Sequence, residues 1–184
     1  LIENVNTDEE SKKFYAEVIL DESNKMDKLV KQLLELMKLE YGKREFNNEE
    51  LNLTELAKEV IRRCNVMLKE NEINVVLDVE KDIFAYADEF YIEQVVTNYF
   101  TNAIKHCDNV NGKKQIIVKI EHIKEKNKIR FSVFNTGENI GEEDLNRIWG
   151  RFYKVDSSRN RENGGSGIGL ALVKAIMVNY QNDY

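Results

Sequence analysis

The chain has 184 residues, of which 42% are hydrophobic and 33% are charged, and its formal net charge is -6. This balance is typical of a globular protein with a packed core. The acidic charge argues against a general nucleic-acid binder, which usually has a basic surface. No apolar run approaches the length of about 18 residues that a membrane-spanning helix needs. Cys64 and Cys107 lie in apolar helical patterns without metal-ligand spacing, so we expect reduced core residues.

The first predicted element is a long helix over residues 7–41. Thr7 and Glu10 have the spacing of a capping box, in which each side chain satisfies a free amide of the first turn. Apolar residues then recur at coiled-coil spacing, which favours packing in a helical bundle. They are Ile19, Met26, Leu29, Leu33 and Leu36. The natural partner of such a helix would precede it, so we expect the chain to begin inside a helical hairpin.

The remaining residues alternate between short strand patterns and amphipathic helix patterns. In chain order, we expect a short strand at 46–48, a helix from an Asn52 N-cap to 71, strands at 73–79 and 83–87, a helix at 88–107, strands at 115–123 and 128–134, a helix at 144–152, a polar segment at 154–166 and a helix from 167 to 179. This order predicts an α+β fold, a two-layer α/β sandwich in which helices cover one face of a mixed sheet. The long helix precedes it.

The predicted helix at 88–107 has two distinct faces. Asn98, Asn102 and Lys105 follow one another at i, i+4 and i+7, and His106 lies between this polar stripe and an apolar one. Amide oxygens suit Mg²⁺, and a lysine can act as a point charge for phosphate. A polar helix face without a ligand is the alternative interpretation. The apolar stripe comprises Ile92, Val96, Tyr99, Phe100, Ala103 and Cys107.

Glycines at 164, 165, 167 and 169 precede the last predicted helix. Glycines at a helix start let the backbone approach a ligand closely, and the free amides there favour an anion such as phosphate. No Lys-Ser or Lys-Thr pair follows, and the run does not follow a strand, so neither a P-loop nor a dinucleotide fingerprint is present. A plain glycine-rich cap is the alternative.

Four segments in this order resemble the boxes of the sensor histidine kinase family, within the wider group that includes Hsp90, DNA gyrase B and MutL. They are residues 93–106 (N box), 133–140 (G1 box), 148–156 (F box) and 165–170 (G2 box). The resemblance implies a Bergerat-type ATP-binding fold that binds ATP with Mg²⁺. It also implies that residues 1–44 belong to a dimerisation and phosphotransfer hairpin, and that residues 45–184 form the catalytic ATP-binding domain.

By this resemblance, Asn102 would hold Mg²⁺ on the ATP phosphates, supported by Asn98, while Lys105 would contact phosphate and His106 would lie against the adenine. Asn135 stands at the position of the family's adenine-reading aspartate, where an amide oxygen can accept the same hydrogen bond without charge. Asn139 and Gly141 also depart from the family pattern. Further nucleotide contacts are implied for Gly137, Ile140, Phe152, Lys154, Gly165, Gly167, Gly169 and Leu170.

Residues 154–164 would form a lid over the phosphates, with basic residues Lys154, Arg159 and Arg161; a solvated loop is the alternative. The phosphate-accepting histidine is expected outside this chain, because His106 belongs to the nucleotide helix and His122 to a strand. We also expect the sheet to lack closing strands after Tyr184, at a cost in stability.

The implied function is transfer of the ATP γ-phosphate to a histidine outside this chain and then to a response regulator. The parent protein would be a homodimeric, membrane-bound bacterial sensor whose cytoplasmic portion includes this chain. Three alternatives remain. One is an ATPase of the Hsp90, gyrase or MutL type, with Glu93 near the position of its catalytic glutamate; another is a dimerising module with a degenerate nucleotide site. The third is a serine kinase that binds a sigma factor.

Overall fold

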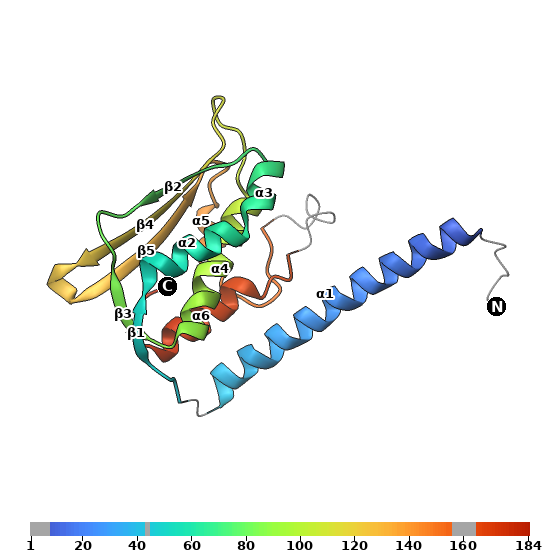
Figure 1. The fold of residues 1–184 in the computed structure, drawn as a ribbon. Helices are drawn as coiled ribbons and strands as arrows, with labels where there is room; N and C mark the ends of the chain where they lie inside the picture. Colours follow the sequence, from blue (N-terminus) through green and yellow to red (C-terminus); the bar gives the residue numbers. More distant parts are fainter. Residues whose placement is uncertain (1–7, 43–44, 156–164) are drawn as a thin grey trace.

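The computed structural model describes residues 8–42, 45–155 and 165–184, and its longest element is helix α1 (Glu9–Tyr41). Asp8 is the N-cap, and its carboxylate accepts a hydrogen bond from the Ser11 amide at 2.7 Å. The helix therefore begins two residues later than predicted, and Thr7 lies outside the described residues. In Figure 1, α1 runs outward from the rest of the molecule.

Among the described residues, only the C-terminal part of α1 packs against the body of the protein. Leu36 and Leu39 are buried, and Leu29 and Leu33 are partly buried against the same core. Ile19 of the predicted seam is 69% exposed and Met26 is 68% exposed. The seam is thus divided between a packed end and an open end. No helix in the described part of the chain combines the length and the apolarity needed to span a bilayer.

A mixed three-stranded sheet forms one layer of the fold. Strand β4 (Gln115–Ile123) lies in the centre, parallel to β2 (Asn74–Asp78) and antiparallel to β5 (Lys128–Asn135). Strands β1 (Glu49–Asn52) and β3 (Phe84–Ala87) pair as a separate antiparallel ribbon. A 3-10 turn at Lys124–Lys126 connects β4 to β5, and Asn127 after it is left-handed at φ 48°.

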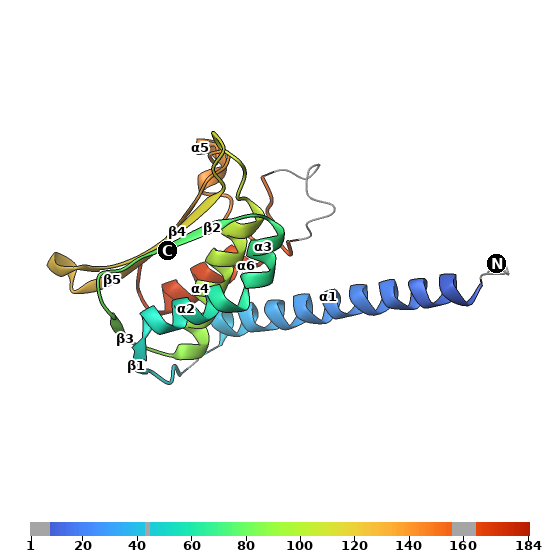
Figure 2. The same cartoon turned by 45° about the horizontal axis from the view of Figure 1, so that its top comes forward.

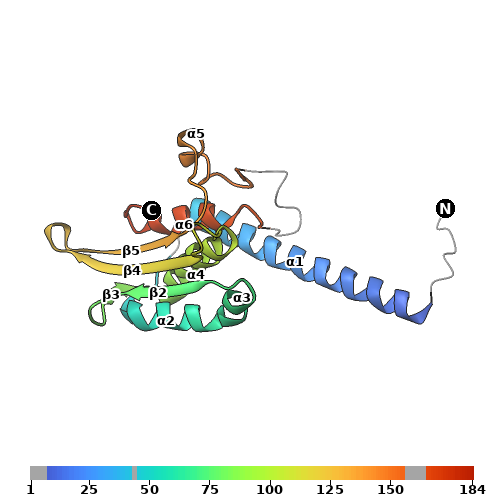
Figure 3. The same cartoon turned by 90° about the horizontal axis from the view of Figure 1, so that it is seen from above.

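Helices form the second layer. Figures 2 and 3 show α2 (Leu53–Arg63), α4 (Glu89–Lys105) and α6 (Gly169–Asn179) on the same side of the sheet, with α1 beyond α6. This arrangement confirms the predicted two-layer sandwich with a preceding long helix. The short helices α3 (Asn65–Glu70) and α5 (Glu142–Leu145) complete the described elements.

Helix α4 lies between two hydrophobic cores. Val96, Phe100, Ala103 and Ile104 pack with α2 and the sheet, whereas Tyr91 and Val95 pack with α1 and α6. The predicted apolar stripe is therefore too narrow, because it includes none of Tyr91, Val95 and Ile104. Ile92 and Tyr99 from that stripe are only partly buried. Cys64 and Cys107 are buried and free, as predicted.

Three predicted elements are wrong in extent. The strand expected at 46–48 is instead β1, displaced to Glu49–Asn52 by its pairing with β3. The helix expected from Asn52 to 71 is interrupted at Cys64 and continues as α3. The helix expected at 144–152 is only the four residues of α5, followed by turns.

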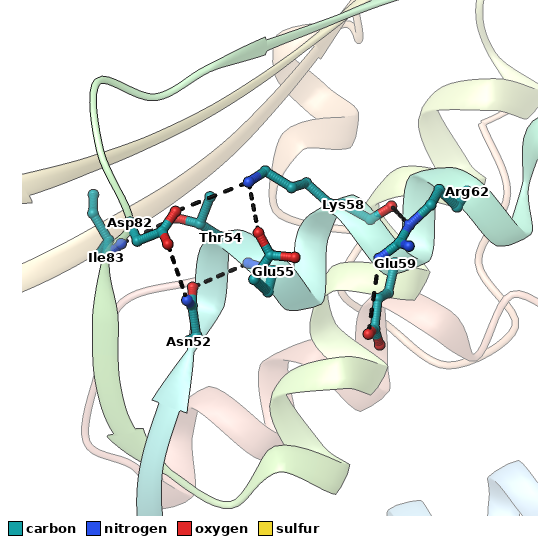
Figure 4. A network of polar contacts seen from close by, with 8 residues as sticks. All are labelled: Asn52, Thr54, Glu55, Lys58, Glu59, Arg62, Asp82 and Ile83. Carbon is teal, nitrogen blue, oxygen red and sulfur yellow. Dashed lines mark hydrogen bonds and ion pairs between the residues drawn. The ribbon is translucent and has the colours of Figure 1, made fainter.

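A polar network joins the start of α2 to the strand pair (Figure 4). Asn52 caps α2 as predicted, and its side-chain oxygen accepts from the Glu55 amide at 3.1 Å. Thr54, the one buried polar residue of the described core, accepts from the Ile83 amide at 3.0 Å. Lys58 pairs with Glu55 at 2.6 Å and lies 3.9 Å from Asp82. The network fixes the entry of β3, and β3 leads into α4 and its polar stripe.

Candidate functional site

The polar stripe of α4 faces the first residue of α6. The Asn98 side-chain amide donates to the Gln94 carbonyl at 2.8 Å within α4. A β-carbon at Gly169 would lie 2.6 Å from Asn98 Oδ1, closer than non-bonded atoms tolerate. Any larger residue at 169 would therefore require the Asn98 side chain to move. Two residues singled out from the sequence, Asn98 and Gly169, are in direct apposition.

Lys105, one turn beyond Asn102, lies beside the glycine run. A β-carbon at Gly165 would lie 3.5 Å from the Lys105 ammonium nitrogen. Lys105 remains accessible to solvent, but desolvation by the surrounding protein lowers its pKa, and the charges of Lys28 and Lys154 lower it further. A lysine whose charged form is disfavoured by burial and by like charges is stabilised by an anion. The Lys105 end of the polar stripe therefore favours binding of a negatively charged ligand.

Asn102 lies between these two contacts, and its side chain is partly buried. Within the described residues, no hydrogen bond engages its side chain, so the amide oxygen is available to a ligand. No group of three or more His, Cys, Asp or Glu side chains that could hold a metal occurs within 8–42, 45–155 or 165–184. A cation in this site would therefore complete its coordination with water and ligand oxygens, which is the usual arrangement for Mg²⁺.

Asn135 is fixed against the C-terminal end of α4. Its side-chain NH₂ donates to the His106 carbonyl at 2.8 Å and to the Thr136 carbonyl at 3.1 Å. Two carbonyl acceptors set the orientation of this amide, because only the nitrogen can donate. Gly137 packs on the same carbonyl: its φ is +153°, and a β-carbon there would lie 2.6 Å from His106 O. Asn135, Gly137 and His106 thus form one cluster.

Thr136 belongs to this cluster and was not identified as a site residue from the sequence. Its hydroxyl donates to the Asp108 carbonyl at 2.8 Å and accepts from the Gln115 amide at 3.0 Å. The Asp108 amide in turn donates to the Thr136 carbonyl at 2.8 Å. Thr136 therefore ties the end of β5 to the segment that follows α4. In the sequence, only its position next to Gly137 could have indicated that Thr136 belongs to the site.

Phe152, in the F-box-like run, and Gly167, in the glycine run, are in contact through their backbones. The Phe152 amide donates to the Gly167 carbonyl at 2.8 Å. Both residues are left-handed, with φ 60° at Phe152 and φ 66° at Gly167. Phe152 is 56% exposed, and its contact with Gly167 is made through the backbone. The residues of the predicted lid from 156 to 164, Arg159 and Arg161 included, lie outside the described residues.

Not every predicted residue joins these contacts. Ile140 is 44% exposed in the loop before α5. Leu170 is partly buried in the first turn of α6, and Lys154 is exposed. A hollow of about 570 Å³ lies elsewhere, lined by Glu55, Lys58, Ile61, Arg62, Val75 and Leu77. It belongs to α2 and β2, which contribute none of the predicted site residues.

Comparison with known proteins gives consistent results. The family model of the histidine kinase-, DNA gyrase B- and HSP90-like ATPases matches residues 87–183. The sensor-like histidine kinase SenX3 of Mycobacterium tuberculosis is 29% identical over 173 residues, which cover 94% of this chain and 41% of SenX3. The sensor histidine kinase WalK of Bacillus subtilis is 29% identical over 167 residues, 90% of this chain and 27% of WalK. The chain thus spans less than half the length of these relatives.

Solved structures show the same fold. Full-length ShkA in complex with AMPPNP has a TM-score of 0.78 at 22% identity, over 96% of this chain and 35% of ShkA. The catalytic domain of histidine kinase ThkA, in a nucleotide-free form, has a TM-score of 0.61 at 28% identity, over 74% of this chain and 82% of that domain. ThkA has also been solved in complex with the response regulator TrrA; that structure matches this chain with a TM-score of 0.63 at 28% identity, over 82% of this chain and 43% of the solved one.

Proposed function

Because the chain belongs to the family of histidine kinase-, DNA gyrase B- and HSP90-like ATPases, we propose that it binds Mg²⁺ and ATP between α4 and the start of α6. The observation that carries this proposal is the apposition of the α4 stripe with the glycine run. Asn98 meets Gly169, and Lys105 meets Gly165. Amide oxygens, a lysine and the N-terminus of α6 together suit a metal-bound phosphate chain.

Each residue of the stripe has a separate task in this proposal. Asn102 offers its amide oxygen to Mg²⁺, and Asn98 positions the start of α6. Lys105 offers its ammonium group to phosphate. Asn102 would hold Mg²⁺ there, and the ion would supply positive charge against the negative charge that develops during phosphoryl transfer.

The base is proposed to bind beside the C-terminal cap of α4, next to Lys105. There the Asn135 NH₂ is engaged by the His106 and Thr136 carbonyls, so its oxygen is the atom left to accept from an adenine amine. His106, Gly137 and Ile140 are proposed to border the same end. Phe152, Lys154, Gly167 and Leu170 are proposed to contact the nucleotide from the side of α6.

The reaction we propose is transfer of the γ-phosphate to a histidine outside this chain, followed by transfer to a response regulator. Support comes from the sensor kinases that the chain resembles and from the ThkA complex with its response regulator. In this proposal residues 1–44 belong to the dimerisation hairpin of a homodimeric, membrane-bound sensor, and residues 45–184 are its cytoplasmic catalytic domain.

An ATPase that uses Glu93 as its base is the main competing function. The Glu93 carboxylate pairs with Arg63 at 2.6 Å. This ion pair engages the Glu93 carboxylate, which an ATPase of that type would need free to activate water. The contact with Arg63 therefore favours the kinase over the ATPase.

The experiment is a titration with fluorescent ATP, with and without Mg²⁺, on the wild type, Asn102→Ala and the control Asn65→Ala. Asn65 is exposed at the start of α3. We expect Mg²⁺ to strengthen binding by the wild type and by the control, and to have little effect on Asn102→Ala. Phosphohistidine should form on a separately supplied acceptor hairpin and not on this chain alone. Failure of the wild type to bind ATP, or steady release of free phosphate without an acceptor, would contradict the proposal.

A further inference from the structure

Helix α1 passes beside the glycine run that begins α6. The Ser166 hydroxyl donates to the Gln32 side-chain oxygen at 3.2 Å. One turn earlier on the same face of α1 is Lys28, at the i-4 position from Gln32. Figures 1 and 2 show α1 beside α6, and the two helices are in contact. Lys28 is therefore carried toward the proposed phosphate end of the site.

The docking of α1 here is held by several other contacts. The Tyr91 hydroxyl donates to Glu35 at 2.8 Å, and the Asn179 side-chain amide donates to the Leu39 carbonyl at 3.0 Å. Arg151 forms an ion pair with Glu40. These contacts lie along one side of the C-terminal half of α1. They fix the rotation of the helix, and with it the direction in which Lys28 and Gln32 face.

Lys28 and Lys13 are the lysines of α1 that have no carboxylate partner among the described residues, and Lys13 lies near the outer end of the helix. Four other lysines of the helix each pair with an acidic residue, namely Lys12, Lys25, Lys31 and Lys38. Lys105 and Lys154 likewise have no ion pair within the described ranges. Lys28 and Lys154 are the two cations whose charges act on Lys105. Three lysines without counter-ions thus converge from α1, from α4 and from the chain after α5.

We propose that Lys28 is a third phosphate-binding cation, supplied to the nucleotide site by α1. The proposal rests on the proposed function, since it takes the triphosphate of ATP as the ligand. Three ammonium groups repel one another, and the negative charges of the phosphate chain reverse that repulsion. Lys28 then binds ATP only while α1 is docked, so that ATP binding and α1 docking strengthen each other by the same factor.

The test measures ATP and adenosine affinity at low ionic strength for the wild type, Lys28→Gln, Lys28→Arg and the control Lys31→Gln. Lys31 lies on the same helix, its side chain is 73% exposed and it pairs with Asp27, so Lys31→Gln removes a similar charge that already has its own counter-ion. We expect Lys28→Gln to weaken ATP binding about five- to tenfold, an effect that fades as salt screens the charges. Lys28→Arg and Lys31→Gln should stay within about twofold of the wild type.

Adenosine lacks phosphate, so its affinity should be the same in all four proteins. If the wild type binds ATP and Lys28→Gln binds it with the same affinity, the proposed role of Lys28 is wrong, whereas the proposed function stands. An equal loss of adenosine affinity would also overturn it, because the effect would then be structural. Absence of ATP binding by the wild type would instead overturn the proposed function, and this inference with it. Lys28 is exposed on α1, so its substitution leaves the folded core intact.

Discussion

The backbone amide of Phe152 and the carbonyl of Gly167 meet at 2.8 Å, and both residues adopt left-handed conformations. Glycine adopts this conformation at no steric cost, whereas a bulky residue such as phenylalanine is strained there. A β-carbon at Gly167 would lie 2.8 Å from Phe152 Cα. This close backbone contact therefore requires glycine at position 167.

We expect Gly167→Ala to destabilise the protein by about 2 kcal/mol, and to weaken ATP binding, since it adds both a clash and backbone strain. Gly112→Ala is the matched control. Gly112 has φ +78°, and nothing lies within 4 Å of its added β-carbon. It should therefore show the strain alone, about 1 kcal/mol, and normal ATP binding. Urea unfolding of both variants separates the two effects, and equal losses would show that the contact with Phe152 is unimportant.

The second prediction concerns the contact between Asn98 and Gly169. Gly169→Ala places a methyl group 2.6 Å from Asn98 Oδ1, so we expect a lower melting temperature and weaker ATP binding. Removing the obstructing side chain should relieve the clash. The double variant Asn98→Ala with Gly169→Ala should melt higher than Gly169→Ala alone, while its Mg²⁺-dependent gain in ATP affinity stays reduced. Purely additive effects on the melting temperature would argue against the contact.

Asn135→Asp tests the orientation of the amide. The introduced carboxylate cannot donate to the carbonyls of His106 and Thr136, so the nucleotide-free protein should lose about 1–3 kcal/mol at neutral pH. Facing two carbonyl oxygens raises the folded-state pKa of the new carboxyl above its unfolded value of about 3.9. The variant is therefore least affected below pH ~4, and its deficit grows as the pH rises through the folded pKa.

Asn139→Asp is the control for this experiment, because it adds the same charge at a residue that is exposed in the following loop. Chemical unfolding at pH 4, 5 and 7 measures the stability of both variants relative to the wild type. A deficit of Asn135→Asp that does not depend on pH would contradict the role given to donation from the Asn135 NH₂ to the His106 carbonyl.

Lys105→Met separates stability from binding. Burial, Lys28 and Lys154 lower the pKa of Lys105, so its charge costs folding free energy. That cost is present below the folded pKa and disappears as the pH rises above the unfolded value of 10.5. The variant should melt about 1–3 °C higher than the wild type at pH 7 without nucleotide, and should bind ATP more weakly.

Lys13→Met is the comparison, since Lys13 is exposed near the start of α1. It should change neither the melting temperature nor ATP affinity. A lower melting temperature for Lys105→Met at pH 7 would contradict the assigned cause of the pKa shift.

Local patterns predicted much of the fold. The alternation from Gln115 to Ile123 gave the bounds of β4, and the Asn52 cap gave the start of α2. By contrast, β1 was misplaced because its position depends on pairing with β3, more than 30 residues away in sequence. Glu49 and Glu50 have little strand propensity of their own. The second core face of α4 was missed for the same reason, since α6 and α1 cover it only after folding.

The candidate site also has a part that local sequence patterns predict and a part that depends on contacts between distant segments. The spacing of Asn98, Asn102 and Lys105 on one helix face is a local property, and it was readable from the sequence. The donation from Asn135 to the His106 carbonyl and the contact of Ser166 with Gln32 join segments 29 and 134 residues apart. No periodic pattern encodes such a contact. The left-handed Phe152 was unexpected too, because phenylalanine has no preference for this conformation and the backbone contact with Gly167 is not visible in the sequence.

The uneven packing of α1 has a mechanical consequence. Leu36 and Leu39 are its only buried residues, whereas Phe14 and Leu20 are 60% and 63% exposed. From Leu36 to Glu9 the helix extends about 40 Å, at about 1.5 Å per residue. A rotation of about 10° around the packed end would then move the far end by about 7 Å. With such a rotation the helix would act as a lever. A large displacement of its outer end would correspond to a much smaller displacement at Gln32, whose side chain contacts Ser166 in the glycine run.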